Sequence, residues 1–95
     1  MRLSLKEKML LELKDKVYKL FSAENFEERM VIMDDIMTYI YSYQLSGASM
    51  DRSFRKLISS QINSYAEEPS KFNKQNVLSV LTAIRIGNQS VIVAK

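Results

Sequence analysis

The sequence predicts an all-α protein, an antiparallel up-and-down four-helix bundle with a short C-terminal tail. Only two Gly and one Pro occur in 95 residues, which is too few for the turns of an all-β domain. In four segments apolar residues recur at spacings of three and four, the period of one face of a helix. Short turns between such segments favour antiparallel neighbours. We expect a single domain over residues 1–95, with helices at about 4–21, 26–46, 50–67 and 71–86 and a tail at 88–95.

The first helix begins at a predicted capping box. Ser4 and Glu7 have the spacing at which the serine oxygen accepts a backbone N–H while the glutamate reaches back. Leu13, Val17 and Leu20 then mark an inward stripe. Lysines are frequent on this helix but alternate with acids. We interpret them as a solvated outer face, with attraction to an acidic membrane surface as the alternative.

The second helix follows Asn25 and Glu28, which repeat the capping-box spacing. It is the most apolar segment of the chain and carries two neighbouring stripes. The stripes are Phe26, Met30, Met33, Met37, Ile40 and Leu45, and beside them Ile32, Ile36, Tyr39 and Tyr43. A helix that is apolar over so wide an arc must be covered on more than one side, so we expect it to be the central support of the bundle. Gly47 is expected to end it.

The third helix is expected to start at a cap formed by Ser49 or Asp51. It should stop before Pro69, because the residue that precedes a proline avoids helical geometry. The predicted inward residues are Met50, Phe54, Leu57, Ile58, Ile62 and Tyr65. Arg52, Arg55 and Lys56 mark its outer face.

The fourth helix is expected to begin at Ser70 or Asn73 and to end at Gly87. Its predicted core stripe is Phe72, Val77, Leu78, Leu81 and Ile84. The tail contains the β-branched run 91–93, and no partner strand for it is apparent in the sequence. The tail is therefore expected either to fold back onto the bundle as an extended segment or to stay exposed as an interaction surface.

Several classes of chemistry lack their usual residues. The chain has no Cys and no His, so it has no disulfide, no thiolate nucleophile and no imidazole base. Asp34 and Asp35 are adjacent, and adjacent residues of a helix point about 100° apart, so the two carboxylates do not converge on one ion. Gly47 and Gly87 are isolated and form no phosphate-binding loop. We expect a protein that is not an enzyme and has no cofactor and no metal site.

Charge and hydropathy predict the location. The net charge of +3 is small for a nucleic-acid-binding protein. No apolar run is long enough to span a bilayer, and the N-terminal segment is too charged for a signal peptide. The expected location is the cytoplasm.

Three segments carry a resemblance to a known family. They are the opening helix LLELKDKVYKLFS, the segment MVIMDDIMTYIYSYQLSGASM that runs into a small-residue loop, and the closing segment VLSVLTAIRIGNQSVIVAK. Together they cover most of the chain and resemble the enterocin A type immunity proteins, which protect bacteria from pediocin-like bacteriocins. This is a likeness of layout rather than of one sharp motif. The tail departs from the family pattern because it is short, and apolar rather than charged.

The resemblance implies a cytoplasmic binding protein, in part at the inner face of the membrane. Its implied partner is the mannose-type phosphotransferase permease with bacteriocin bound, whose open pore it would block. Specificity in this family resides in the C-terminal half. Carried onto this chain, that implies the loop at 67–71 (Glu67, Glu68, Pro69, Ser70 and Lys71) and also Lys74, Arg85, Asn88, Gln89, Val91 and Ile92 as partner-binding residues.

Two other functions remain open at this point. Arg52, Arg55 and Lys56 follow a Gly-containing turn, an arrangement with a distant likeness to a helix-turn-helix, so a nucleic-acid-binding or regulatory protein is one alternative. A generic helical adaptor or dimer that uses the Met and Tyr side chains of the second helix is the other.

Overall fold

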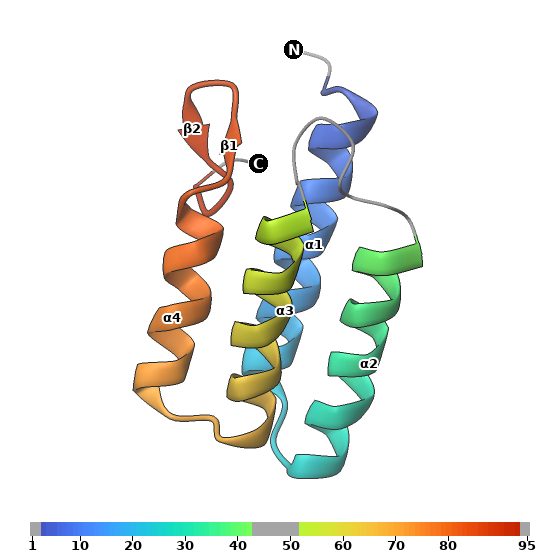
Figure 1. Ribbon diagram of the computed structural model, residues 1–95, viewed down its shortest axis with the longest axis vertical. Helices are drawn as coiled ribbons and strands as arrows, with labels where there is room; N and C mark the ends of the chain where they lie inside the picture. Colours follow the sequence, from blue (N-terminus) through green and yellow to red (C-terminus); the bar gives the residue numbers. More distant parts are fainter. Residues whose placement is uncertain (1–2, 43–51, 94–95) are drawn as a thin grey trace.

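The computed structural model describes residues 3–42 and 52–93, and its four helices run alternately up and down one long axis (Figure 1). They are α1 (Leu5–Ser22), α2 (Phe26–Ser42), α3 (Arg52–Glu67) and α4 (Lys71–Thr82). Two short strands, β1 (Arg85–Ile86) and β2 (Gln89–Ser90), follow α4 as an antiparallel hairpin. The predicted all-α four-helix bundle with a short C-terminal tail is therefore confirmed.

The helix starts follow the predicted capping chemistry. The Ser4 hydroxyl accepts the Glu7 N–H at 3.1 Å, and the Glu7 carboxylate accepts the Ser4 N–H at 3.0 Å. Asn25 accepts the Glu28 N–H at 2.8 Å. Of the two candidates for the start of α4, Ser70 is the cap, and it accepts the Asn73 N–H at 3.1 Å. These bonds satisfy N–H groups that have no partner inside their own helix.

The core lies along the bundle axis and takes residues from every helix and from the hairpin. Its buried members are Leu10, Leu13, Val17, Leu20, Ile36, Tyr39, Ile40, Ile58, Ile62, Tyr65, Ala66, Val77, Leu81, Ile84, Ile86 and Val91. Successive helices pack on one another. An edge-on contact of the Phe21 and Tyr65 rings, with centroids 5.0 Å apart, joins α1 to α3. Lys74 lies over the Phe21 ring at 5.2 Å and joins α4 to α1.

The expectation that the second helix is the central support is wrong. α2 stands at one edge of the bundle, and α3 lies between α2 and α4 (Figure 1). Ile36, Tyr39 and Ile40 of α2 are buried, while Val31 is 69% exposed. Val31 lies about 140° around the helix from Ile36, because five residues turn the chain by roughly 500°. α2 is therefore covered by α1 and by α3, and Val31, which belongs to neither predicted stripe, lies on its open face.

The fourth helix is shorter than predicted. It ends at Thr82 instead of continuing to residue 86, and Gly87 forms a turn between two strands rather than a helix stop. Gly87 has φ +62°, and it makes the two-residue loop of the hairpin together with Asn88. A Gly-Asn pair is a favoured loop for such a hairpin. The tail therefore has a partner strand, which the sequence analysis took for the end of a helix.

Two predicted core residues lie on the surface. Phe72 is 74% exposed because it is five residues before Val77, which places it on the opposite side of α4. Leu57 is 47% exposed, since its neighbour Ile58 takes the inward position. The predicted end of the second helix, the start and cap of the third, and the inward residues Tyr43, Leu45 and Met50 lie outside the described residues.

Candidate functional site

The C-terminal hairpin is anchored to the bundle by its own apolar side chains. Ile84, Ile86 and Val91 are buried, and the Val91 N–H donates to the Ile84 carbonyl at 2.8 Å. Arg85, which lies between Ile84 and Ile86, is exposed, so residues 84–86 alternate as in a strand with one face on the core. Gln89 of β2 is exposed as well. The hairpin therefore presents polar side chains from a fixed backbone.

The structure separates the predicted partner-binding residues into two groups. Lys71 and Lys74 lie in the first turn of α4, at the end of the molecule opposite to the hairpin (Figure 1). The hairpin group is Arg85, Asn88, Gln89 and Ile92. The 12 residues of α4 keep the two groups apart by roughly 18 Å. A compact site can therefore contain the hairpin residues or the two lysines, but not both.

Val91, also predicted to bind a partner, has no exposed surface. Val91 directly follows β2, and its side chain is buried in the core. Ile92 is half-buried and Val93 is 64% exposed. Of the run 91–93, the first residue is therefore structural, and contact with a partner is limited to the other two.

The predicted loop between the third and fourth helices is held by Asn73. Its side-chain amide donates to the carbonyl of Glu68 at 2.7 Å and, at the longer distance of 3.4 Å, to that of Ser64. Glu67, Glu68 and Pro69 are exposed beside Lys71. This loop carries acids and bases together.

A hollow lies at the base of the hairpin, where three elements meet. It is lined by Lys6, Leu10, Phe54, Ala83, Ile84 and Arg85. Its floor is apolar, and its two charged members are both cations. The hollow brings the first turn of α1 and the first turn of α3 against the C-terminal segment.

The same end of the molecule is basic, and we call it the basic end. It comprises the first two turns of α1 and of α3, the last two turns of α2 and of α4, and the hairpin (Figure 1). Those turns of α2 and α4 contain no charged residue. Among the described residues, the basic end carries the cations Lys6, Lys8, Arg52, Arg55, Lys56 and Arg85 and the single acid Glu7.

Outside the basic end, the described residues carry an excess of acids. They include six basic and nine acidic side chains. The opposite end carries Glu27 and Glu28 in the first turn of α2, Glu67 at the end of α3, Lys19 in the last turn of α1, and Lys71 and Lys74 in the first turn of α4. The small net charge of the whole sequence therefore conceals an uneven distribution.

The one acid of the basic end is already engaged. The Ser4 backbone N–H, followed by the Ser4 hydroxyl, lowers the pKa of Glu7 from its ordinary value of 4.5. Lys6 and the Gly87 backbone lower the pKa of Glu7 further. Glu7 is therefore ionised at neutral pH and caps α1 instead of pairing with the other cations.

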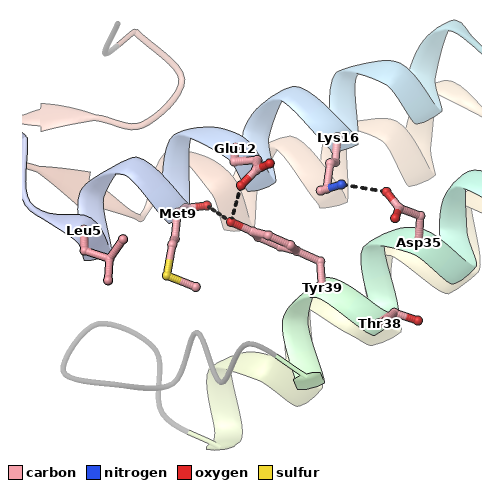
Figure 2. A pocket seen from close by; sticks show the side chains of 7 residues that line it. All are labelled: Leu5, Met9, Glu12, Lys16, Asp35, Thr38 and Tyr39. Carbon is pink, nitrogen blue, oxygen red and sulfur yellow. Dashed lines mark hydrogen bonds and ion pairs between the residues drawn. The ribbon is translucent and has the colours of Figure 1, made fainter.

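A second candidate site is the groove between α1 and α2, shown in Figure 2. Its lining residues are Leu5, Met9, Glu12, Lys16, Asp35, Thr38 and Tyr39. The Tyr39 hydroxyl crosses the groove and donates to Glu12 Oε2 at 2.7 Å, and it lies 3.3 Å from the Met9 carbonyl. Lys16 pairs with Asp35 at 2.7 Å and lies over the Tyr39 ring.

The groove is built for packing rather than for reaction. Its charges are paired across α1 and α2, and no nucleophile stands beside a base among its lining residues. The sequence analysis placed Tyr39 on an apolar stripe and missed its bond to Glu12. Seven residues separate Tyr39 from Ile32 and four from Asp35, which puts all three on one face, but the spacing alone does not reveal which polar group faces α1.

The arrangement of α2 and α3 differs from a helix-turn-helix. In that motif two helices cross at about 90–120°. Here α2 and α3 lie side by side and run in opposite directions (Figure 1). The two described helices on which the nucleic-acid alternative depends therefore lack the geometry of the motif.

The described residues hold neither a cluster of metal ligands nor a membrane-spanning helix. Residues 3–42 and 52–93 contain no group of three or more acidic side chains placed to hold a metal ion. None of the four described helices combines the length and the hydropathy that crossing a membrane requires. Comparison of the chain with protein-family models, with curated proteins and with solved structures finds no match.

Proposed function

We propose that the protein is a bacteriocin immunity protein that acts by binding rather than by catalysis. It protects the cell from pediocin-like bacteriocins by associating with a mannose-type phosphotransferase permease that has bacteriocin bound. It works in the cytoplasm, in part at the inner face of the membrane. The proposal starts from the resemblance of the opening, central and closing segments to the enterocin A type immunity proteins.

The observation that carries the proposal is the anchored C-terminal hairpin. The resemblance implies that specificity resides in the C-terminal half, and in this chain that half ends in polar side chains on a backbone fixed by Ile84, Ile86 and Val91. A pre-ordered element loses little conformational entropy on binding, which favours recognition. We assign recognition to Arg85, Asn88, Gln89 and Ile92.

Binding without catalysis agrees with the residue chemistry. The sequence offers no His and no Cys, and the polar residues of the α1–α2 groove are engaged with one another. A surface of this kind holds a partner through shape and hydrogen bonds. Blocking the open state of a pore requires nothing more.

The test is a protection assay in a sensitive strain that expresses the chain. Challenge with a panel of pediocin-like bacteriocins should show protection against at least one of them. The triple variant Arg85→Ala, Asn88→Ala, Gln89→Ala should lose that protection at an unchanged protein level. The matched control is Lys71→Ala with Lys74→Ala, which alters the other predicted group and should still protect.

Two results would overturn parts of this proposal. Unchanged sensitivity to every bacteriocin would remove the function itself. Protection that survives in the hairpin variant and fails in the lysine variant would move the recognition surface to the first turn of α4.

A further inference from the structure

We propose that the basic end docks on the surface of an anionic phospholipid bilayer, with the long axis of the bundle directed away from the membrane. Six cations and one engaged acid are gathered there from α1, α3 and the hairpin. The inference rests on the proposed function for the reason why the protein would bind a membrane, since an immunity protein of this class acts there. Its physical basis is the placement of charge and of exposed apolar side chains.

Five of the six cations of the basic end are exposed to an outside partner: Lys6, Lys8, Arg52, Lys56 and Arg85. The sixth, Arg55, is half-buried and lies over the Tyr41 ring at 5.8 Å. The ion pair of Lys16 and Asp35 lies outside the basic end. Two helices begin and two finish at this end, so the helix dipoles largely offset each other and the side chains set the potential.

Exposed apolar side chains stand among these cations. Leu5 opens α1 and is 76% exposed, and Leu57 lies in the second turn of α3. Tyr41, near the end of α2, and Val93, after the hairpin, are also exposed. Bilayer interfaces attract such mixtures, because the apolar groups enter the headgroup boundary while the cations meet anionic lipids.

The shape of the molecule favours docking through this end. The bundle measures 38 Å along its long axis and 25 × 21 Å across. The attraction of an anionic membrane falls off within a Debye length, about 8 Å at physiological ionic strength. End-on docking places the cations within that range and keeps the acids of the opposite end outside it. A molecule lying flat on the membrane would bring both the cations and the acids close to the lipid surface.

A nucleic acid is the other polyanion that could meet this surface, and the structure favours it less. Nucleic-acid binding uses base-reading side chains on a helix in a groove, or stacked aromatic rings. Of the aromatic rings at the basic end, Phe54 is half-buried and Tyr41 is already covered in part by Arg55, at 5.8 Å. The other exposed apolar residues there are aliphatic, and a phosphate backbone gains nothing from Leu5 or Val93. These residues contribute at a bilayer interface.

The experiment is sedimentation of the full chain with unilamellar vesicles. Vesicles of phosphatidylcholine alone are compared with vesicles that contain phosphatidylglycerol, at low and at physiological salt. The test variant is Lys6→Gln, Arg52→Gln, Lys56→Gln, which leaves the hairpin residues unchanged. The matched control is Lys19→Gln, Lys71→Gln, Lys74→Gln, which has the same net charge but is altered at the opposite end.

We expect binding to the anionic vesicles only, and weaker binding as salt rises. The test variant should bind roughly 100-fold more weakly, because each basic side chain near the surface contributes about fivefold. The control should keep most of its binding. Leu5→Gln should also weaken binding to vesicles. Circular dichroism of each variant verifies that the helical bundle is intact.

Other results would overturn the inference. Equal losses in the test and control variants would show an effect of net charge alone. Duplex DNA that displaces the chain from vesicles, with no effect of Leu5→Gln, would assign the basic end to nucleic acid. The vesicles contain neither bacteriocin nor permease. Protection of cells without vesicle binding would therefore overturn the docking surface alone, and vesicle binding without protection would overturn the proposed function alone.

Discussion

At the scale of single residues, Tyr39 ties α1 to α2. Its ring is buried, its hydroxyl reaches Glu12 at 2.7 Å, and the Lys16 ammonium lies 5.1 Å from the ring centroid. The three groups come from facing sides of two helices, as Figure 2 shows. One side chain therefore combines apolar burial with a hydrogen bond to a charged group.

Tyr39→Phe should destabilise the fold by about 1–1.5 kcal/mol. The ring stays in the core, and the Glu12 carboxylate turns to water, so the loss is that of one hydrogen bond. Urea unfolding followed by circular dichroism measures it. Tyr41→Phe is the matched control, because Tyr41 is 48% exposed, and its midpoint should not change. A Tyr39→Phe midpoint equal to that of the parent chain would contradict the bond's contribution.

Glu7 gives the chain an acid-dependent contribution to stability. Its pKa in the folded chain is below the ordinary value of 4.5, mainly because of the Ser4 N–H. A carboxyl whose pKa is lowered by folding stabilises the fold above its unfolded pKa and loses that contribution as the pH falls through its folded pKa. Glu7→Gln should therefore lower the thermal midpoint at neutral pH and flatten its decline in acid. If the thermal midpoints of the two proteins fell in parallel as the pH decreases, the capping carboxylate would make no pH-dependent contribution to stability.

At the scale of elements, α2 has one buried and one open face. Ile36 has no exposed surface, and Val31 is mostly exposed. Residues of both predicted stripes of α2 face the core, and Val31, which belongs to neither stripe, lies on the open face. A local pattern does not reveal that this face stays open, because that depends on where the other helices pack. Phe72 was misplaced for a simpler reason, since a step of five residues leaves the helical period.

Ile36→Asp should unfold the bundle, because a buried and unpaired charge costs several kcal/mol. Val31→Asp should cost much less, about 1 kcal/mol or under, because the site is exposed and only repulsion from acids three and four residues away opposes the change. Those acids, Glu27, Glu28, Asp34 and Asp35, repel a carboxylate more at position 31 than at position 36, so a larger loss at position 36 is due to burial. Thermal melts recorded by circular dichroism give both values. Similar melting of the two variants would contradict the assigned faces of α2.

The hairpin is the element for which the sequence analysis was least accurate. Gly87 is predicted to end the fourth helix, whereas Gly87 and Asn88 together form a hairpin loop when extended residues flank them. Long-range packing of Ile86 and Val91 on the core decides between the two conformations, and this contact is invisible in a local pattern.

Cutting the chain after Gly87 should lower its stability while most helical signal remains at low temperature. Removal of Val91 alone forfeits about 1.5–3 kcal/mol of apolar burial, and Ile84 and Ile86 lose their cover as well. The control is the full chain with Asn88→Ala and Gln89→Ala, which should melt like the parent protein. A truncated chain that melts at the parent midpoint would show that the hairpin contributes nothing to the stability of the bundle.

At the scale of the whole molecule, a single core connects all four helices and the hairpin. Tyr39 and Tyr65 are buried in it, and the chain has no Trp to mask the emission of its five tyrosines. A domain of this size with one core unfolds in one step, with a free energy of about 5–14 kcal/mol. Tyrosine fluorescence and far-ultraviolet circular dichroism should therefore give the same urea midpoint. Two separate midpoints would show that a part of the bundle unfolds by itself.

The uneven charge along the long axis gives the molecule a permanent electric dipole. Its 38 Å length is several times the screening distance in the cell, about 8 Å, so each end responds to its own surroundings. A negatively charged surface would therefore rotate such a molecule before contact, so that the basic end with its hairpin faces the surface. Docking of the kind proposed above would then begin with the proposed recognition residues already oriented, and a partner would be sought only by diffusion in the plane of that surface.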